Sequence, residues 1–124
     1  MTTVKNFKDL NVWRMSRELV TDIYRLCAKF PSNEKYGLAS QMQRAAVSIP
    51  SNIAEGFDRK SNKEFEQFLS IARGSVAELN TQLIIANDLG LIDDNDFKSI
   101  EKRTIEVHKM INSFLKYLRK DEKK

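Results

Sequence analysis

Apolar residues recur every three or four positions in four long stretches of the chain, and polar residues separate them. That spacing places the apolar side chains on one face of an α-helix, which turns once in about 3.6 residues. It predicts four amphipathic helices at about residues 9–29, 34–59, 62–88 and 94–119. The charged segment 120–124 follows the last helix, and we expect it to fray.

The first and third predicted helices have wider apolar stripes than a helix with two neighbours needs. In the first, the stripe centre consists of Leu10, Trp13, Val20, Ile23, Cys27 and Phe30, and its flanks of Val12, Met15, Leu19 and Leu26. The third also carries the small residues Ala72, Gly74, Ser75 and Ala77, which let a neighbouring helix approach closely. Either the core is broad, or some apolar surface serves another subunit.

Local signals mark the helix boundaries. Pro31 ends the first helix, because the residue before a proline is driven out of the α region. Ser61 and Glu64 have the spacing of a capping box, which predicts the start of the third helix. Gly90 marks its end, and Asp93 or Asp94 opens the fourth helix at the positive end of the helix dipole.

Pro50 lies inside the second apolar pattern. An interior proline removes one backbone hydrogen bond and clashes with the preceding turn, so the segment is either one kinked helix or two shorter helices. The apolar spacing is kept across Pro50, which favours a continuous helix with a kink.

Four amphipathic helices joined by short connections are typical of a bundle of antiparallel neighbours. The sequence therefore predicts an all-α protein, with residues 1–124 forming one domain that is an antiparallel up-and-down four-helix bundle.

The composition agrees with this fold and narrows the function classes. Apolar residues make up 41% and charged residues 31% of the 124 residues, and four glycines and two prolines are too few for a β-rich protein. The single Cys27 excludes an internal disulfide and a zinc site of paired cysteines. No apolar run reaches the roughly 18 residues of a membrane span, and no apolar signal-peptide segment begins the chain. We therefore expect a cytoplasmic protein with no membrane partner.

No catalytic or metal-binding constellation is recognisable, so we expect neither an enzyme nor a bound cofactor. The di-iron sites of four-helix bundles need two Glu-x-x-His pairs and two further glutamates. His108 is the one histidine, and Ile105 stands where its glutamate would be. The acidic run 93–96 lacks the glycine and the later glutamate of a calcium loop, and it is typical of a helix start.

A polar row follows one side of the predicted helix 34–59. Its members recur every three or four positions and are Gln41, Arg44, Ser48, Asn52, Glu55 and Arg59. One interpretation is an ordinary solvated face with an Arg–Glu ion pair, which contributes little stability. The other is a polar network at a subunit interface or in a groove that holds a ligand.

A lysine row lies in one narrow angular sector of the fourth predicted helix, with Glu106 at its edge. Its members are Lys98, Lys102, Lys109, Lys116 and Lys120. With the net charge of +4, such a row can follow a phosphate backbone, although solvated lysines are common on helix surfaces. Repetition around a symmetric oligomer would sum the rows into a larger field and favour nucleic-acid binding.

Several strings of residues point to a known family. The longest and most specific runs from Arg44 to Gly56 (RAAVSIPSNIAEG). The others are Leu10–Trp13, Phe30-Pro31, Tyr36–Leu38 with Gln41, Glu64-Phe65 with Phe68-Leu69, and Ala72–Ser75 with Glu78-Leu79 and Thr81–Leu83. Together they resemble the four-helix-bundle proteins encoded in 23S rRNA intervening sequences, over nearly the whole chain.

The resemblance extends to the accessory protein of diversity-generating retroelements, which forms a five-membered ring of bundles, binds nucleic acid and assists a reverse transcriptase. It therefore implies a homopentamer with a basic surface, RNA or DNA as a partner, and a polymerase-type protein as a further partner. Arg44 and the lysine row are the expected nucleic-acid contacts. Where relatives are expected to have two adjacent basic residues before Ala45, this chain has Gln43-Arg44, which weakens any contact made by that pair.

The leading hypothesis is a non-enzymatic homo-oligomer that binds RNA or DNA through basic surface residues. The alternative is a protein-interaction adaptor or scaffold with no direct nucleic-acid role. A third hypothesis, an enzyme or small-ligand bundle that uses the polar row of helix 34–59, has the least support.

Overall fold

The computed structural model describes the backbone of residues 4–122 and the side chains of residues 4–120. Its four helices are α1 (Asn11–Cys27), α2 (Leu38–Phe57), α3 (Asn62–Asp88) and α4 (Asp94–Glu122). Two short 3-10 turns, η1 (Phe7–Asp9) and η2 (Ser32–Glu34), precede α1 and α2. No strand occurs within residues 4–122, so the predicted all-α class is confirmed.

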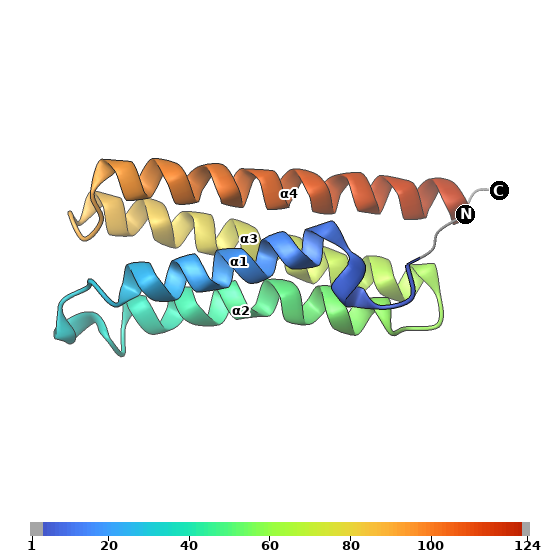
Figure 1. The fold of residues 1–124 in the computed structure, drawn as a ribbon, viewed down its shortest axis with the longest axis horizontal. Coiled ribbons are helices and arrows are strands. Elements are labelled where there is room, and N and C mark those ends of the chain that lie inside the picture. Colours follow the sequence, from blue (N-terminus) through green and yellow to red (C-terminus); the bar gives the residue numbers. More distant parts are fainter. Residues whose placement is uncertain (1–3, 123–124) are drawn as a thin grey trace.

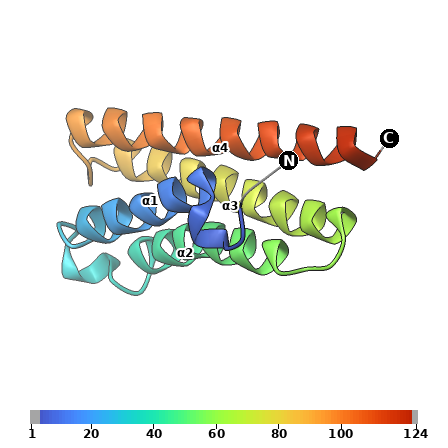
Figure 2. The same cartoon turned by 45° about the vertical axis from the view of Figure 1, so that its right-hand side comes forward.

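The helices form an up-and-down bundle, and consecutive helices run antiparallel (Figures 1 and 2). α1 and α3 each pack on α2 and on α4, whereas the diagonal pairs α1–α3 and α2–α4 do not pack together within the described residues. The contact between α2 and α3 is the most extensive of the four. The predicted four-helix bundle is therefore confirmed.

Capping interactions explain where α3 and α4 begin and end. The Ser61 hydroxyl accepts a hydrogen bond from the Glu64 amide at 3.2 Å, which confirms Ser61 as the N-cap of α3, and it donates to the Glu64 carboxylate at 3.3 Å. Gly90 takes the left-handed conformation (φ 74°), and the amide of Leu91 donates to the carbonyl of Ala86 at 2.9 Å, which ends α3 in a Schellman motif. The carboxylate of Asp93 accepts from the Asp96 amide at 2.8 Å and caps α4.

Two predicted boundaries are wrong. The second helix begins at Leu38 and not near residue 34, because Ser32–Glu34 form a separate 3-10 turn and Gly37 has non-helical angles (φ −104°, ψ −113°). The helix α4 continues to Glu122, so residues 120–122 are not a frayed tail. Residues 123–124 of that expected tail lie outside the described residues.

α2 passes through Pro50 as one continuous helix, as the apolar spacing predicts. The alternative of two shorter helices is thereby excluded. The kink at Pro50 stays a prediction.

The core takes large side chains from all four helices, as the apolar pattern predicts. Fully buried members include Leu19, Ile23, Met42, Ile49, Ile53, Leu69, Leu79, Leu83, Val107, Ile111 and Leu115. In α1 the buried face differs from the predicted one. Trp13 and Val20, at the centre of the predicted stripe, are only half-buried, whereas Leu26, on its predicted flank, is buried. Trp13 and Val20 turn instead toward a surface groove between α1 and α2, which also contains Val47 and Pro50.

The helices differ in length, and this leaves one end of the bundle open. α1 has 17 residues and α4 has 29, so α4 is longer by about 18 Å at about 1.5 Å per residue. The last turns of α4 and the first turns of α3 extend past the start of α1, at the end where α2 connects to α3 (Figure 1). None of the helices in the described part of the chain is long and apolar enough to cross a membrane.

Candidate nucleic-acid interface

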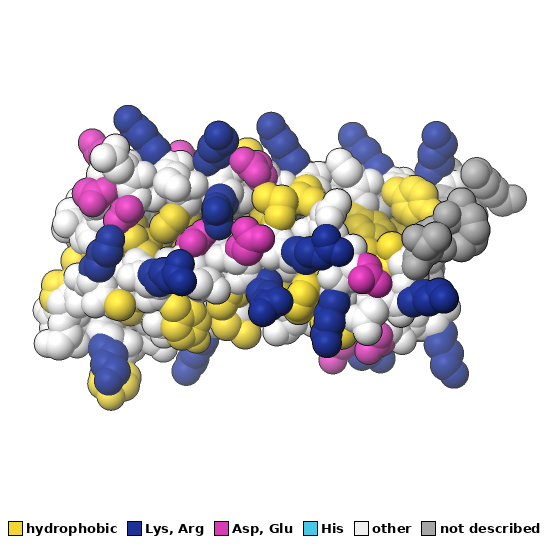
Figure 3. Space-filling view, in the orientation of Figure 1, with side chains coloured by type: hydrophobic (Ala, Val, Ile, Leu, Met, Phe, Trp, Pro, Cys, Tyr) yellow, Lys and Arg dark blue, Asp and Glu magenta, His cyan; other side chains and the backbone are white. Residues whose placement is uncertain are grey.

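The five members of the lysine row are all exposed on α4. At about 100° per residue they lie within about 40° of one another around the helix axis. They face away from the side of α4 that buries Val107, Ile111 and Leu118 in the core. The row extends about 33 Å along the axis, and Lys and Arg side chains project at intervals along the α4 edge of the molecule (Figure 3).

The arginines of α4 differ from its lysines, because they pair with acidic residues of neighbouring helices. Arg103 contacts Asp22 of α1 at 2.6 Å, and Arg119 contacts Glu66 of α3 at 3.1 Å. None of the five lysines forms an ion pair with another described residue. The arginines therefore attach α4 to the bundle, while the lysine charges face solvent.

The positive charge is concentrated in the second half of α4. The helix begins with Asp94 and Asp96, and Glu106 lies at the edge of the row. From residue 107 to residue 120 the sequence contains Lys109, Lys116, Arg119 and Lys120 and no acidic residue. We therefore expect the strongest attraction for phosphate near the C-terminal half of α4.

Arg44 is exposed on α2, the helix diagonal to α4, so the structure does not bring it to the lysine row. It borders a shallow surface depression between α1 and α2 together with Tyr24 and Val47. The two sets of residues expected to contact nucleic acid therefore lie on different sides of the bundle.

The polar row of α2 is divided between packing and solvent. The hydroxyl groups of Ser48 and Ser75 are 2.8 Å apart across the contact with α3, and the Asn52 amide donates to the Ser48 carbonyl at 2.8 Å. Gln41 and Arg44 are exposed, and Glu55 pairs loosely with Arg59 at 3.8 Å. The middle of the row is thus a polar network inside the chain, and the residues at its ends are exposed.

The Arg59 guanidinium also lies 4.7 Å from the centre of the Phe68 ring. This cation–π contact, with the Glu55 pair, holds Arg59 against the outside of the α2–α3 contact.

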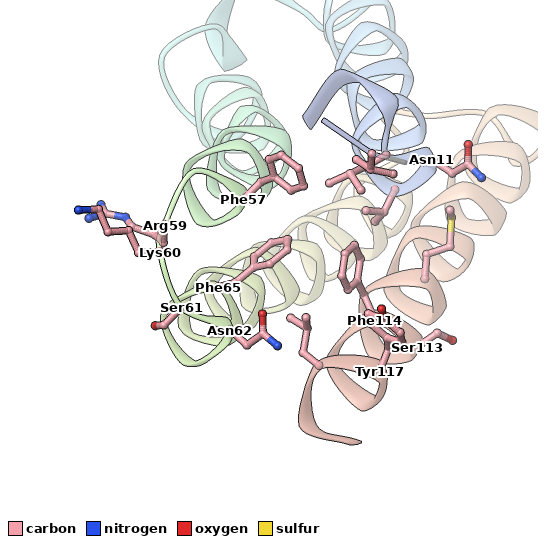
Figure 4. Close-up of a pocket in the computed structure, with 15 residues that line it drawn as sticks. Asn11, Phe57, Arg59, Lys60, Ser61, Asn62, Phe65, Ser113, Phe114 and Tyr117 are labelled. Atoms are coloured by element: carbon pink, nitrogen blue, oxygen red, sulfur yellow. The ribbon is translucent and has the colours of Figure 1, made fainter. Parts of the chain in front are cut away.

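A groove of about 700 Å³ lies at the end of the bundle where α2 connects to α3, and Val4 and Leu10 of the N-terminal segment also line it. Four aromatic residues line it, one from the end of α2, one from the start of α3 and two from the end of α4, namely Phe57, Phe65, Phe114 and Tyr117. Ring centres are 6.0 Å apart for Phe57–Phe65, 5.1 Å for Phe65–Phe114 and 6.3 Å for Phe114–Tyr117, all edge to face. Figure 4 shows the rings of Phe57, Phe65 and Phe114 turned toward one another, while Arg59 and Lys60 point away.

A family model described as 23S rRNA-intervening sequence protein matches residues 8–113. The chain belongs to that family. The resemblance carried by the string from Arg44 to Gly56 is thereby confirmed.

A solved structure with the same fold supports the assignment of this chain to the family. It is a protein of unknown function from the S23 ribosomal protein family of Bacteroides thetaiotaomicron VPI-5482, with a TM-score of 0.79 and 25% sequence identity. The match covers 85% of this chain and 95% of that one. The search of curated proteins finds no match. Lys116, Tyr117 and Lys120 lie beyond the segment that the family model matches.

His108 takes part in a polar chain between α3 and α4 in this family member. The Arg73 guanidinium donates to the Asn112 amide oxygen at 2.9 Å, and the Asn112 nitrogen lies 3.2 Å from Nδ1 of His108. Because the Asn112 oxygen accepts from Arg73, its NH₂ group donates to His108, and Nδ1 is then the unprotonated ring nitrogen. The Arg73–Asn112 bond therefore joins α4 to α3, and His108 contacts Asn112 within α4.

Two further chemical groups lie away from the interface. Burial raises the pKa of the Cys27 thiol to about 11, which keeps it protonated and unreactive at neutral pH. Among the described residues, no group of three or more His, Cys, Asp or Glu side chains is placed to hold a metal ion.

The aromatic groove was not predicted. Phe57, Phe65 and Phe114 fit the apolar spacing of core residues, and Tyr117 belongs to none of the rows or strings described above. A signal was present, because all four aromatic residues lie within three turns of a helix end. The sequence does not say which helix ends meet, and that depends on the order and the lengths of the packed helices.

Proposed function

We propose that this protein is a non-enzymatic homo-oligomer that binds RNA or DNA through the lysine row of α4. The observation that carries the proposal is the contrast on α4 between paired arginines and unpaired lysines. Arg103 and Arg119 are held by acidic partners, whereas Lys109, Lys116 and Lys120 have no acidic partner among the described side chains. Phosphate contacts need only such accessible cations, and no reacting group is required.

The test is fluorescence anisotropy with an rRNA hairpin and a single-stranded DNA oligonucleotide at several salt concentrations. Because phosphate contacts release counterions, log K should fall linearly with log salt, with a slope of about −0.7 per contact for a single strand. No binding of either probe at low salt would refute the proposal, and salt-independent binding would refute the phosphate mechanism.

Exposed apolar residues support the oligomeric part of the proposal. Tyr24 and Val47 are 47% and 40% exposed beside the α1–α2 groove, and Ile71 and Ile85 are 53% and 43% exposed on α3. A ring needs two different complementary patches, because each subunit contacts its neighbours head to tail. The expected number of subunits, five, comes from the resemblance to ring-forming relatives.

Light scattering measures the number of subunits directly. We expect a solution mass close to five times the chain mass of 14.4 kDa. A stable monomer would remove the oligomer from the proposal, together with the summed field of repeated lysine rows.

The same exposed apolar residues favour the alternative, a protein-interaction adaptor that docks a polymerase-type partner. The two functions differ in what the lysines do. An adaptor with incidental charge would bind both nucleic-acid probes weakly, and neutralising the row would leave the docking of its partner unchanged.

A further inference from the structure

The exposure of the aromatic residues increases along the groove from α3 to the outer side of α4. Phe65 is only 7% exposed, Phe114 is half-buried, and Tyr117 is 61% exposed. Phe65 and Phe114 pack into the core, whereas most of the Tyr117 side chain lies outside it. A large exposed ring at the end of an aromatic series offers a flat apolar surface to a ligand.

Tyr117 borders the lysine row. Lys120 lies one turn further along α4, about 4.5 Å along the axis and about 60° around it, and Lys116 is the preceding residue. Both lysines are exposed and have no ion pair with another described residue. An aromatic surface and phosphate-binding cations are therefore adjacent at the C-terminal half of α4, where positive charge is highest.

Neighbouring aromatic and cationic side chains favour single-stranded over double-stranded nucleic acid. A duplex presents its phosphates to the lysines, but its bases are already stacked on one another. A single strand presents phosphates and free base faces together, and base stacking on aromatic side chains is a common way to bind it. An acyl chain or an apolar peptide segment would use the rings but not the row of cations beside them.

We propose that the aromatic groove receives an unpaired base of a single-stranded nucleic acid whose phosphates lie on Lys116 and Lys120. The base stacks on Tyr117 and reaches toward Phe114. The groove volume of about 700 Å³ lies within the usual range of small-ligand pockets and accommodates a nucleotide. This inference rests on the proposed function, and it specifies single strands as the preferred substrate.

The experiment compares three probes of equal length by anisotropy: an oligothymidylate, an abasic strand with the same phosphates, and a duplex. With the native protein, we expect the oligothymidylate to bind roughly tenfold or more tightly than the abasic strand, because only the former can stack. This comparison requires no variant and does not depend on how a substitution affects folding.

Two substitutions then locate the stacking. Tyr117→Leu should weaken oligothymidylate binding roughly tenfold and leave abasic and duplex binding unchanged, whereas Tyr117→Phe, which keeps the ring, should bind like the native protein. The matched control is Tyr36→Leu. Tyr36 is 87% exposed beside Lys35 and lies in the α1–α2 connection at the opposite end of the bundle, so that change should have no effect.

The outcomes separate this inference from the proposed function. If no probe binds, the proposed function fails and the inference fails with it. If all three probes bind equally well, or if Tyr117→Leu and Tyr36→Leu behave alike, the lysine row binds nucleic acid but the groove does not receive a base. If Tyr117→Leu lowers the solution mass without a base-dependent loss of affinity, the groove contacts another protein chain and the inference is overturned.

Discussion

The two polar rows of this bundle, one along α2 and one along α4, each follow one side of a helix but lie in different surroundings. In the middle of the α2 row, Ser48 and Asn52 have short side chains and form hydrogen bonds inside the α2–α3 contact. On α4, long lysines extend into solvent and have no acidic partner among the described residues. Short polar side chains covered by a neighbouring helix therefore stabilise the fold, whereas long side chains that face solvent are available for binding.

The α2–α3 contact shows how close that packing is. A Cβ atom built at Gly56 would lie 2.6 Å from Cβ of Phe68 and 2.9 Å from the ring of Phe65. The small residues Ala45 of α2 and Ala72 of α3 are also buried. In this contact the Ser48 and Ser75 hydroxyl groups lie 2.8 Å apart and hydrogen-bond to each other, and the Asn52 side chain also donates to the Ser48 hydroxyl at 3.0 Å.

The largest expected effect comes from neutralising the C-terminal half of the lysine row. Substituting Lys109, Lys116 and Lys120 with Gln should weaken nucleic-acid binding about 100-fold at low salt and reduce the salt slope by about two. The control replaces Lys5, Lys8 and Lys35, which are also exposed, so both triple variants lose three charges from the net +4. Equal losses of affinity in the two variants would show that overall charge, and not the row, attracts the ligand.

The next largest effect is a loss of stability when the close contact between α2 and α3 is disturbed. Gly56→Ala should lower the free energy of unfolding by about 1–3 kcal/mol, because the added methyl group overlaps Phe68 and Phe65. Gly74→Ala is the matched control, since nothing lies within 4 Å of its added Cβ, and it should stabilise α3 by about 0.5–1 kcal/mol. Urea unfolding at equal protein concentration measures both, and a neutral Gly56→Ala would contradict the close packing.

A smaller effect is expected at the polar centre of the α2 row. Ser48→Ala should cost about 1–2 kcal/mol of stability, because Ser75 is only 8% exposed and would lose its hydrogen-bond partner. Replacing Ser75 with Ala as well should recover part of the loss, as a double-mutant cycle would show. If the single variant were as stable as the native protein, Ser48 would belong to the solvated face.

The smallest effect contrasts an arginine of α4 with the lysine beside it. Arg103→Gln should lower stability by about 0.2–1 kcal/mol, because it removes a partly exposed ion pair with Asp22 and leaves the lysine row intact. Lys102→Gln should change stability by less than about 0.5 kcal/mol and weaken nucleic-acid binding a few-fold. Thermal unfolding and anisotropy on both variants would show whether the two effects separate. If Arg103→Gln impaired binding more than Lys102→Gln, the assignment of separate roles would be contradicted.

The sequence predicts the fold well, because helix formation and capping are local. The spacing of apolar residues identifies all four helices, and Ser61 with Glu64 marks the start of α3 to the residue. The start of α2 was placed about four residues too early, because Gly37 takes non-helical angles and separates the turn at Ser32–Glu34 from the helix. The end of α4 was placed too early because charged residues near a terminus suggest fraying, whereas the helix continues to Glu122.

The lysine row could be recognised from the sequence because all its members belong to one helix, and about 100° of rotation per residue determines which side chains share a face. The sequence also determined the family, through the string from Arg44 to Gly56. The tertiary structure decided which polar groups face solvent. It paired Arg103 and Arg119 with other helices, enclosed Ser48 against α3, and brought the ends of α2, α3 and α4 together to form the aromatic groove. These outcomes depend on which helices are neighbours and on how far each one extends, and no single segment of the chain contains that information.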